Sequence, residues 1–352
     1  MGNLARGEHH RRMDRAVLEA ALDAAPDRSP VNDDGRSGAV LQRVRLPDGT
    51  SVVVKHFDPS VDLIMRMTGD ATGREVDLFQ RGVLDALPRS VLHPVVDAWY
   101  DDDGLGVLVM RDLGDEVLSW ASVVTPAQAR TMIAAVADLH ATFAGSVPED
   151  LTPLDRVLRL FEPARLQAYA GESLVDHALR GWQYWPEVAT GEVAEGVLAL
   201  AFDTAPLVAA CAARPATLLH GDLSTVNMAL ESDRPGCLTL IDWGIATTGP
   251  AGLDLGRLLA GCAHVFGPVG PDASATIVAR LDGLLDLYRE VAGSTYDEDG
   301  VRLGLLAGIS WLGWNKALDI VEHPNPAVRE RERAALPWWL RQAGLAFESG
   351  LV

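Results

Sequence analysis

The sequence of 352 residues has little cysteine and few basic side chains. Its three cysteines, Cys211, Cys237 and Cys262, form no CxxC pair, which argues against a disulfide framework and against a zinc site. We therefore expect a reducing, cytoplasmic location. The formal net charge is −19. We expect no nucleic-acid partner, because phosphate contacts need lysine and arginine.

Long apolar runs are also missing. The longest uncharged apolar stretch, LGLLAGISWLGW at 303–314, is too short to span a bilayer, so we expect no membrane partner. The first residues, MGNLARGEHHRR, lack the apolar core of a secretion signal. Apolar residues nevertheless make up 48% of the chain, which is enough for a folded core.

Lysine is nearly absent, since Lys55 and Lys316 are the two lysines among 30 basic residues. In a chain that otherwise uses arginine, a retained lysine hints at a chemical requirement. The charge is also uneven: residues 1–113 have 14 basic and 19 acidic side chains, whereas 114–352 have 16 and 30. Two explanations stay open, a solvated acidic surface that keeps the protein soluble or a field that attracts a cationic substrate.

Periodicity predicts an α+β fold in two parts, as the length also suggests. The first part reads as a small antiparallel sheet with one inserted helix, and the second as mainly helical from Thr125 onward, with a boundary near RDLG at 111–114. The first part is expected to contain helices at 9–25 and 72–87 and strands at 39–46, 51–57, 94–100 and 104–110. Later strand patterns lie at 216–222, 227–232 and 237–244.

Two of these later strand patterns border polar motifs that suggest phosphoryl transfer. In HGDLSTVN, Asp222 is followed five residues later by Asn227, and in LIDWG a second carboxylate stands at Asp242. Transfer to a hydroxyl needs a carboxylate near the acceptor, oxygen ligands for Mg²⁺ and a cation on the phosphates. A loop aspartate, an asparagine five residues on and an acid in a DFG-like turn form the kinase pattern.

With these motifs the sequence resembles the aminoglycoside phosphotransferase family, from about residue 30 to about 320. The resemblance implies a bilobal, protein-kinase-like fold, with a nucleotide-binding lobe at 1–113 and a lobe at 114–352 that holds the catalytic loop, the metal motif and the acceptor site. It implies that Asp222 is the base or orienter of the acceptor hydroxyl, and that Asn227 and Asp242 bind Mg²⁺. The alternative for these three residues is a role as turn or cap residues.

The resemblance also assigns a nucleotide site for ATP or GTP. Lys55 matches the phosphate-binding lysine, with Glu75 as its ion-pair partner; alternatively, Glu75 closes a helix capping box that begins at Thr72. Ser37, in the glycine-containing loop NDDGRSGAV, offers a hydroxyl to phosphate. In LVMRDLG, which resembles the hinge, Arg111 and Leu113 would bind the adenine edge through backbone groups, without need of the Arg111 side chain.

The acceptor side is marked by aromatic residues in the second part. ISWLGWNKALDI places Trp311, Trp314 and Lys316 on one predicted helix, and GWQYWPEV adds Trp185. These residues are candidates for the acceptor site, although an apolar core is the other explanation of such a pattern. The resemblance implies a kinase of an antibiotic hydroxyl. The alternatives are a kinase of sugars, choline-like alcohols or amino-acid alcohols, and a nucleotide-binding pseudokinase.

Overall fold

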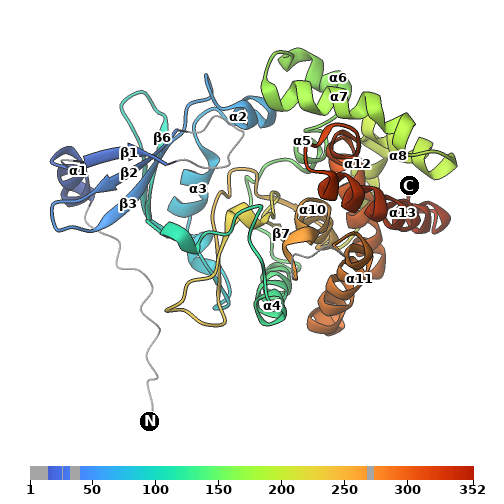
Figure 1. The fold of residues 1–352 in the computed structure, drawn as a ribbon. Helices are drawn as coiled ribbons and strands as arrows, with labels where there is room; N and C mark the ends of the chain where they lie inside the picture. Colours follow the sequence, from blue (N-terminus) through green and yellow to red (C-terminus); the bar gives the residue numbers. More distant parts are fainter. Residues whose placement is uncertain (1–14, 26, 32–39, 268–272) are drawn as a thin grey trace, which may run out of the picture.

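The computed structural model describes residues 15–25, 27–31, 40–267 and 273–352, and Ser37 therefore lies outside the described residues. Its first part is a five-stranded antiparallel sheet in the order β1-β2-β3-β6-β5. Figure 1 shows the labelled strands β1, β2, β3 and β6 together on the left of the molecule. The strands are β1 (Asp27–Pro30), β2 (Val40–Arg45), β3 (Ser51–His56), β5 (Val95–Tyr100) and β6 (Gly106–Arg111). The four predicted strands of this part are confirmed, whereas β1 was not anticipated.

Helices cover both faces of this sheet. Because side chains alternate along a strand, β3 presents Val52 and Val54 to one face and Lys55 to the other. Helix α1 (Arg15–Asp23) covers the first face with Leu18 and Leu22. The second face meets α3 (Arg74–Gln80). Helix α2 (Leu63–Thr68) and the 3-10 turn Leu84–Ala86 belong to the larger apolar core on that side. The helix expected at 72–87 is shorter than predicted, because Gly82 adopts a left-handed φ of 73° soon after α3 ends.

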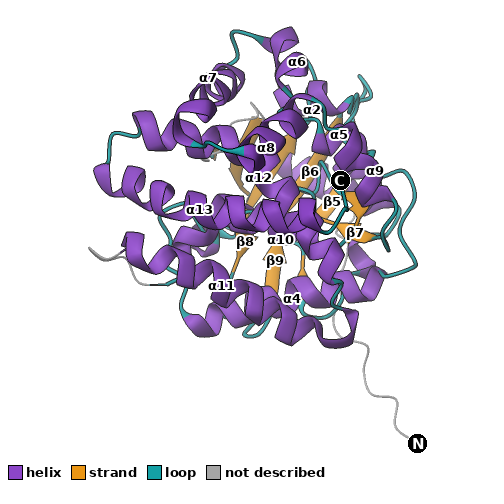
Figure 2. Ribbon diagram, turned by 90° about the vertical axis from the view of Figure 1, so that its right-hand side faces the viewer, coloured by secondary structure: helices purple, strands orange, loops and turns teal. Residues whose placement is uncertain are grey.

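The second part is mainly helical, as predicted (Figure 2). Helix α4 begins as the sequence indicates, because Thr125 and Gln128 form a capping box and Pro126 fills the first turn. The helices are α4 (Pro126–Phe143), α5 (Leu154–Leu158), α6 (Pro163–Leu166), α7 (Ser173–Val188), α8 (Glu192–Phe202), α9 (Ala205–Ala212), α10 (Gly252–Cys262), α11 (Ala273–Ala292), α12 (Glu298–Glu322) and α13 (Pro326–Glu348). No single helix of the described ranges is long and apolar enough to cross a membrane, although the bent pair α8 and α9 passes that test jointly.

Short strands carry the polar motifs within this helical part. A three-stranded sheet joins β4 (Val91–Leu92), β9 (Leu238–Leu240) and β8 (Met228–Ala229), and β7 (Thr217–Leu219) pairs with β10 (Thr247–Gly249). The predicted strands beside the two motifs are therefore present, and β10 is an addition. Since β4 precedes residue 113 and pairs with β9 beyond it, the two parts share backbone contacts. One apolar core also runs from Phe57 to Ala346, so the domain boundary at 113 stays a prediction.

Helices α10 and α12 lie in close contact because both carry glycine on the shared face. A Cβ added at Gly256 would lie 1.8 Å from the carbonyl oxygen of Gly304, and one at Gly252 would lie 2.2 Å from that of Gly300. Such an approach between backbones requires glycine on at least one side. This contact fixes the position of α10, which places Asp254 and Arg257 beside the loop of Asp222.

All four residues proposed for the acceptor site are buried. Trp185 on α7 and Trp314 on α12 are 1% and 2% exposed, and the Trp185 indole donates to the carbonyl of Ala194. Lys316 is also buried, and its ammonium contacts Glu332 at 2.9 Å and lies over the Trp339 ring. The prediction that these three residues contact an acceptor is therefore corrected: the aromatic pattern marks core packing, and Lys316 neutralises a buried carboxylate.

The buried charges on α13 generate a stability prediction. Burial alone raises the pKa of Glu332, but the ammonium of Lys316 and the guanidinium of Arg331 outweigh it and hold the pKa at about 2. Replacing Glu332 with Gln leaves Lys316 buried without its carboxylate. We expect the free energy of unfolding, measured by urea denaturation at pH 7, to fall by about 3–5 kcal/mol.

The pH dependence checks the cause. Because the pKa of Glu332 is lower in the folded than in the unfolded chain, its stabilisation is complete above the ordinary glutamate pKa and is lost as the pH falls toward 2. The difference between Glu332→Gln and the wild type should shrink over that interval. Glu330→Gln, which removes an exposed partner of Arg333, is the control and should cost about 0–1 kcal/mol. Equal costs for the two variants would contradict this account.

Candidate active site

The centre of the site is the buried ammonium of Lys55. It lies between Glu75 Oε2 at 3.0 Å and Asp242 Oδ1 at 2.8 Å, which come from α3 and from the turn after β9. Burial lowers the pKa of Lys55, but the carboxylates of Asp242 and Glu75 outweigh burial and raise the pKa above its ordinary value. Lys55 therefore stays charged at a point where three separate elements meet.

Glu75 is a partner of Lys55 and not a capping residue. The N-cap of α3 is Gly73, without a side-chain cap, and Asp70 accepts the backbone N–H groups of Gly73 and Arg74 at 2.9 and 2.7 Å. The second carboxylate oxygen of Glu75 accepts the backbone N–H of Trp243 at 3.1 Å. The predicted ion pair is present, and the capping-box alternative is wrong.

Asp242 stands in a constrained turn. Its φ is 64°, a left-handed value that non-glycine residues adopt with difficulty. The neighbouring Trp243 is fully buried and holds the turn through its bond to Glu75. About half of the Asp242 side chain stays exposed. Burial of the site opposes ionisation, but Lys55 outweighs it and lowers the pKa of Asp242, so an ionised carboxylate faces outward.

The loop that carries Asp222 is held by Asp254 of α10. The carboxylate of Asp254 accepts the backbone N–H groups of His220 at 2.8 Å and Gly221 at 3.0 Å, and it lies 3.2 Å from Nε2 of His140. Burial raises the pKa of Asp254, but His140 and the other donors outweigh it, and the pKa is lowered. At Gly221 φ is 84°, and a Cβ there would lie 2.2 Å from the carbonyl oxygen of Ile245. Asp254 therefore holds the loop in place, and the close approach of Gly221 to Ile245 requires a glycine.

His220 connects the two motifs. Its ring is fully buried, Nε2–H donates to the carbonyl of Ile241 at 2.9 Å, and the ring lies 4.7 Å from that of Trp243. Because Ile241 precedes Asp242, this hydrogen bond sets the loop of Asp222 against the turn of Asp242. His220 therefore holds the two motifs together.

Asp222 is partly exposed and makes two side-chain contacts. The Asn227 amide donates to its Oδ2 at 3.2 Å and to its backbone carbonyl at 2.9 Å, and Arg257 Nη2 lies 2.7 Å from its Oδ1. Since the Asn227 nitrogen is bound to Asp222, its amide oxygen is the group that remains for a cation. Arg257 was not predicted from the sequence. The one signal for it was a cation three residues after Asp254 on the same helix.

The donor set fits Mg²⁺. Asp242 and Asn227 offer a carboxylate and an amide oxygen, hard ligands of the kind that Mg²⁺ takes in ones or twos beside phosphate and water. In the described part of the chain, no group of three or more histidine, cysteine or acidic side chains is arranged for a metal.

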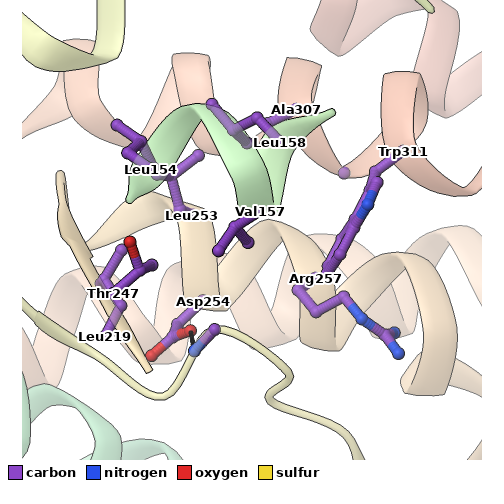
Figure 3. Close-up of a pocket in the computed structure, with 12 residues that line it drawn as sticks. Leu154, Val157, Leu158, Leu219, Thr247, Leu253, Asp254, Arg257, Ala307 and Trp311 are labelled. Carbon is purple, nitrogen blue, oxygen red and sulfur yellow. Dashed lines mark hydrogen bonds between the residues drawn. The ribbon is translucent and has the colours of Figure 1, made fainter. Parts of the chain in front are cut away.

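A small cavity lies beside the loop of Asp222, between α5, α10 and α12 (Figure 3). Its polar margin includes Asp254 and Arg257, and Trp311 lies next to Arg257 with the guanidinium 5.1 Å from the ring centre. Among the four proposed acceptor residues, Trp311 is the one beside the polar site. The rest of the wall is mostly apolar and includes Leu154, Val157, Leu158, Leu253 and Ala307.

At the proposed hinge, the side chain of Arg111 joins two segments of the chain. The Arg111 guanidinium binds both oxygens of Glu231, at 2.7 and 3.1 Å, which connects the end of β6 to the segment after β8. Its backbone N–H donates to Pro94 at 2.9 Å. The carbonyl of Arg111 and the N–H of Leu113 stay the proposed contacts for a nucleotide base, and the Arg111 side chain is used elsewhere, as expected.

Comparison with known proteins identifies the family. The model of the family described as "Phosphotransferase enzyme family" matches residues 35–293, most of the chain. No curated protein matches. Among solved structures, the chain is similar to aminoglycoside phosphotransferase APH(3'')-Id from Streptomyces rimosus, with 17% identity, a TM-score of 0.51, and coverage of 85% of this chain and 98% of the other.

Two further solved structures are similar at lower scores. They are aminoglycoside-3'-phosphotransferase of type VIII (22% identity, TM-score 0.48, coverage 84% and 98%) and macrolide 2'-phosphotransferase MphH from Brachybacterium faecium (18%, 0.45, 91% and 96%). At these identities a likeness shows the fold alone. The α+β, kinase-like fold and the phosphotransferase class predicted from the sequence are confirmed.

The bonds to Asp254 generate a stability prediction. In Asp254→Asn, the new NH₂ group would face a donor on the loop or on His140, whichever way the amide is turned. We expect the free energy of unfolding in urea to fall by about 1–3 kcal/mol, the cost of an unsatisfied buried donor. Asp286→Asn, at an exposed ion pair on α11, is the matched control and should change it little. Wild-type stability in Asp254→Asn would show that the loop does not depend on this carboxylate.

Proposed function

The chain belongs to the phosphotransferase enzyme family, and from this premise we propose that it transfers the γ-phosphoryl group of ATP or GTP, with Mg²⁺, to a hydroxyl of a small molecule. One observation carries the proposal: Lys55, Glu75 and Asp242 meet in one ion cluster, and His220 connects that cluster to the loop of Asp222. One connected set of bonds therefore holds both Asp242, the carboxylate proposed for a metal, and Asp222, the carboxylate proposed for an acceptor.

The residues of the ion cluster form the centre of the proposed nucleotide site. Lys55 would bind phosphate oxygens, and Glu75 would keep its ammonium in place. Asp242 and the amide oxygen of Asn227 would hold Mg²⁺, which when bound neutralises charge on the phosphates. Ser37 and the backbone groups of Arg111 and Leu113 are the further proposed nucleotide contacts.

Asp222 is the centre of the proposed acceptor site. Its carboxylate would orient the acceptor hydroxyl and receive its proton as the acceptor oxygen bonds to the γ-phosphorus. The bond from that phosphorus to the bridging oxygen breaks, and the nucleoside diphosphate leaves with the electron pair. Trp311 is the proposed aromatic contact beside this position.

An antibiotic is the first acceptor class that we propose, because an aminoglycoside phosphotransferase is among the structures with a similar fold. A sugar or another metabolic alcohol is the second class. The three cysteines are free, which supports a reducing, cytoplasmic setting. To test the function, the protein is incubated with Mg²⁺, ATP or GTP and a panel of antibiotics and alcohols, and phosphorylated products are sought by mass. Nucleotide binding without any product would favour a pseudokinase.

Asp222→Asn tests the acceptor role. The amide keeps the shape of the side chain but does not accept the proton, so turnover should fall by roughly 10²- to 10⁴-fold. Affinity for Mg²⁺–nucleotide, measured by calorimetric titration, should change little, because Asp222 faces the acceptor. Turnover near the wild-type rate would refute the assignment.

The metal ligands are separated by a pair of variants. Asp242→Ala removes a carboxylate and Asn227→Ala removes a neutral amide, so Mg²⁺-dependent nucleotide affinity should fall further in Asp242→Ala. The comparison requires titration with the nucleotide in the presence and absence of Mg²⁺. Full Mg²⁺-dependent affinity in both variants would place the metal elsewhere.

A further inference from the structure

Asp222 already has a cationic partner. Arg257 Nη2 lies 2.7 Å from Asp222 Oδ1, the distance of a charge-assisted hydrogen bond. Arg257 lies on α10, one turn after Asp254, which binds the backbone of the same loop. The helix that holds the loop therefore also supplies the counter-charge for its carboxylate.

The guanidinium is held in place and has unused donors. Its side chain is 13% exposed and packs on the Trp311 ring at 5.1 Å. Gly261 leaves it room, since a Cβ there would lie 2.6 Å from Arg257 Nη1. Its Nε is buried without a hydrogen-bond partner among the described residues. A guanidinium has five N–H donors, so binding Asp222 does not exhaust it.

We propose that Arg257 is a positioning and specificity-determining residue: it orients Asp222 and donates to an oxygen of the acceptor beside the reacting hydroxyl. The acceptor is then a hydroxyl compound without an ammonium group beside the reacting hydroxyl, such as a sugar, a polyol, a hydroxy acid or an antibiotic of that kind. This inference rests on the proposed function, because it assumes that the hydroxyl binds at Asp222.

The charges beside Asp222 and the acidic surface around the site act on an acceptor over different distances. An ammonium group next to the reacting hydroxyl would lie close to a guanidinium that already neutralises Asp222, so this ion pair would not attract the ammonium. The acidic surface of 114–352 acts at longer range and is screened over about 10 Å at 0.1 M salt. Net charge alone suggested a cationic substrate as one possibility, whereas the contact at Asp222 favours an acceptor without a cation at that point.

The test compares acceptors that differ in one group. Glucose, glucosamine and glucuronate form one series, and glycerol, serinol and glycerate form another; compounds found active by the mass assay are added with their amino or carboxy analogues. The kcat/KM of each is measured under saturating Mg²⁺–nucleotide for the wild type, Arg257→Gln and Arg257→Lys. Arg333→Gln removes an exposed cation elsewhere in the same lobe and is the charge-matched control.

We expect the wild type to prefer uncharged or anionic acceptors. In Arg257→Gln, the ratio of kcat/KM for cationic over uncharged acceptors should rise at least about tenfold. Arg257→Lys should retain the wild-type ratio with a higher KM, because it keeps the charge but has fewer donors, and Arg333→Gln should match the wild type. Calorimetric binding of Mg²⁺–nucleotide shows that each variant is folded. If Arg257→Gln does not fold, the wild-type preference and Arg257→Lys decide the question.

Two results would overturn the inference in different ways. A wild-type preference for an ammonium beside the phosphorylated hydroxyl, or an equal loss on all acceptors in Arg257→Gln, would reject the specificity role and leave the kinase assignment intact. A wild type that phosphorylates no compound would reject the proposed function, and the inference with it.

Discussion

A buried ammonium must be paired, and this requirement organises the whole site. Lys55 on β3 is removed from water, so its charge is tolerable only with carboxylates in contact. Glu75 brings α3 to the sheet, and Asp242 brings the turn after β9. The same Glu75 binds the backbone at Trp243. One cation therefore connects the sheet, its helix and the metal motif, and it keeps Asp242 ionised and half exposed.

Helix α10 holds the loop of Asp222 in place, as Lys55 holds the turn of Asp242. Asp254 binds the backbone at His220 and Gly221, and Arg257 binds the Asp222 side chain. Glycines at the contact with α12 fix the position of this helix, because backbones approach where a Cβ would collide. His220 then ties the loop to the residue before Asp242. The two halves of the site are thus coupled through backbone bonds as well as through charge.

The sequence allowed the strands and the motif residues to be predicted, because alternation and fixed spacing are local properties of the chain. The sequence did not show whether an aromatic residue belongs to the apolar core or to a pocket. The spacing of Trp185 and Trp314 fits both, and the structure shows that contacts with other helices bury them in the core. Lys316 was misread for the same reason, since Glu332 lies on the following helix. Arg257 was missed because its partner, Asp222, is 35 residues away in the sequence, and no motif includes both residues.

The central claim is that the loop of Asp222 and the ion cluster of Lys55 act together in phosphoryl transfer. The most direct measurement uses a nucleotide labelled with ¹⁸O at the non-bridging oxygens of its γ-phosphate, with Mg²⁺ and an acceptor that the mass assay identifies. The labelled phosphoryl group should appear as an ester on the acceptor, whose own oxygen forms the bridge. Recovery of the label as inorganic phosphate alone would contradict it.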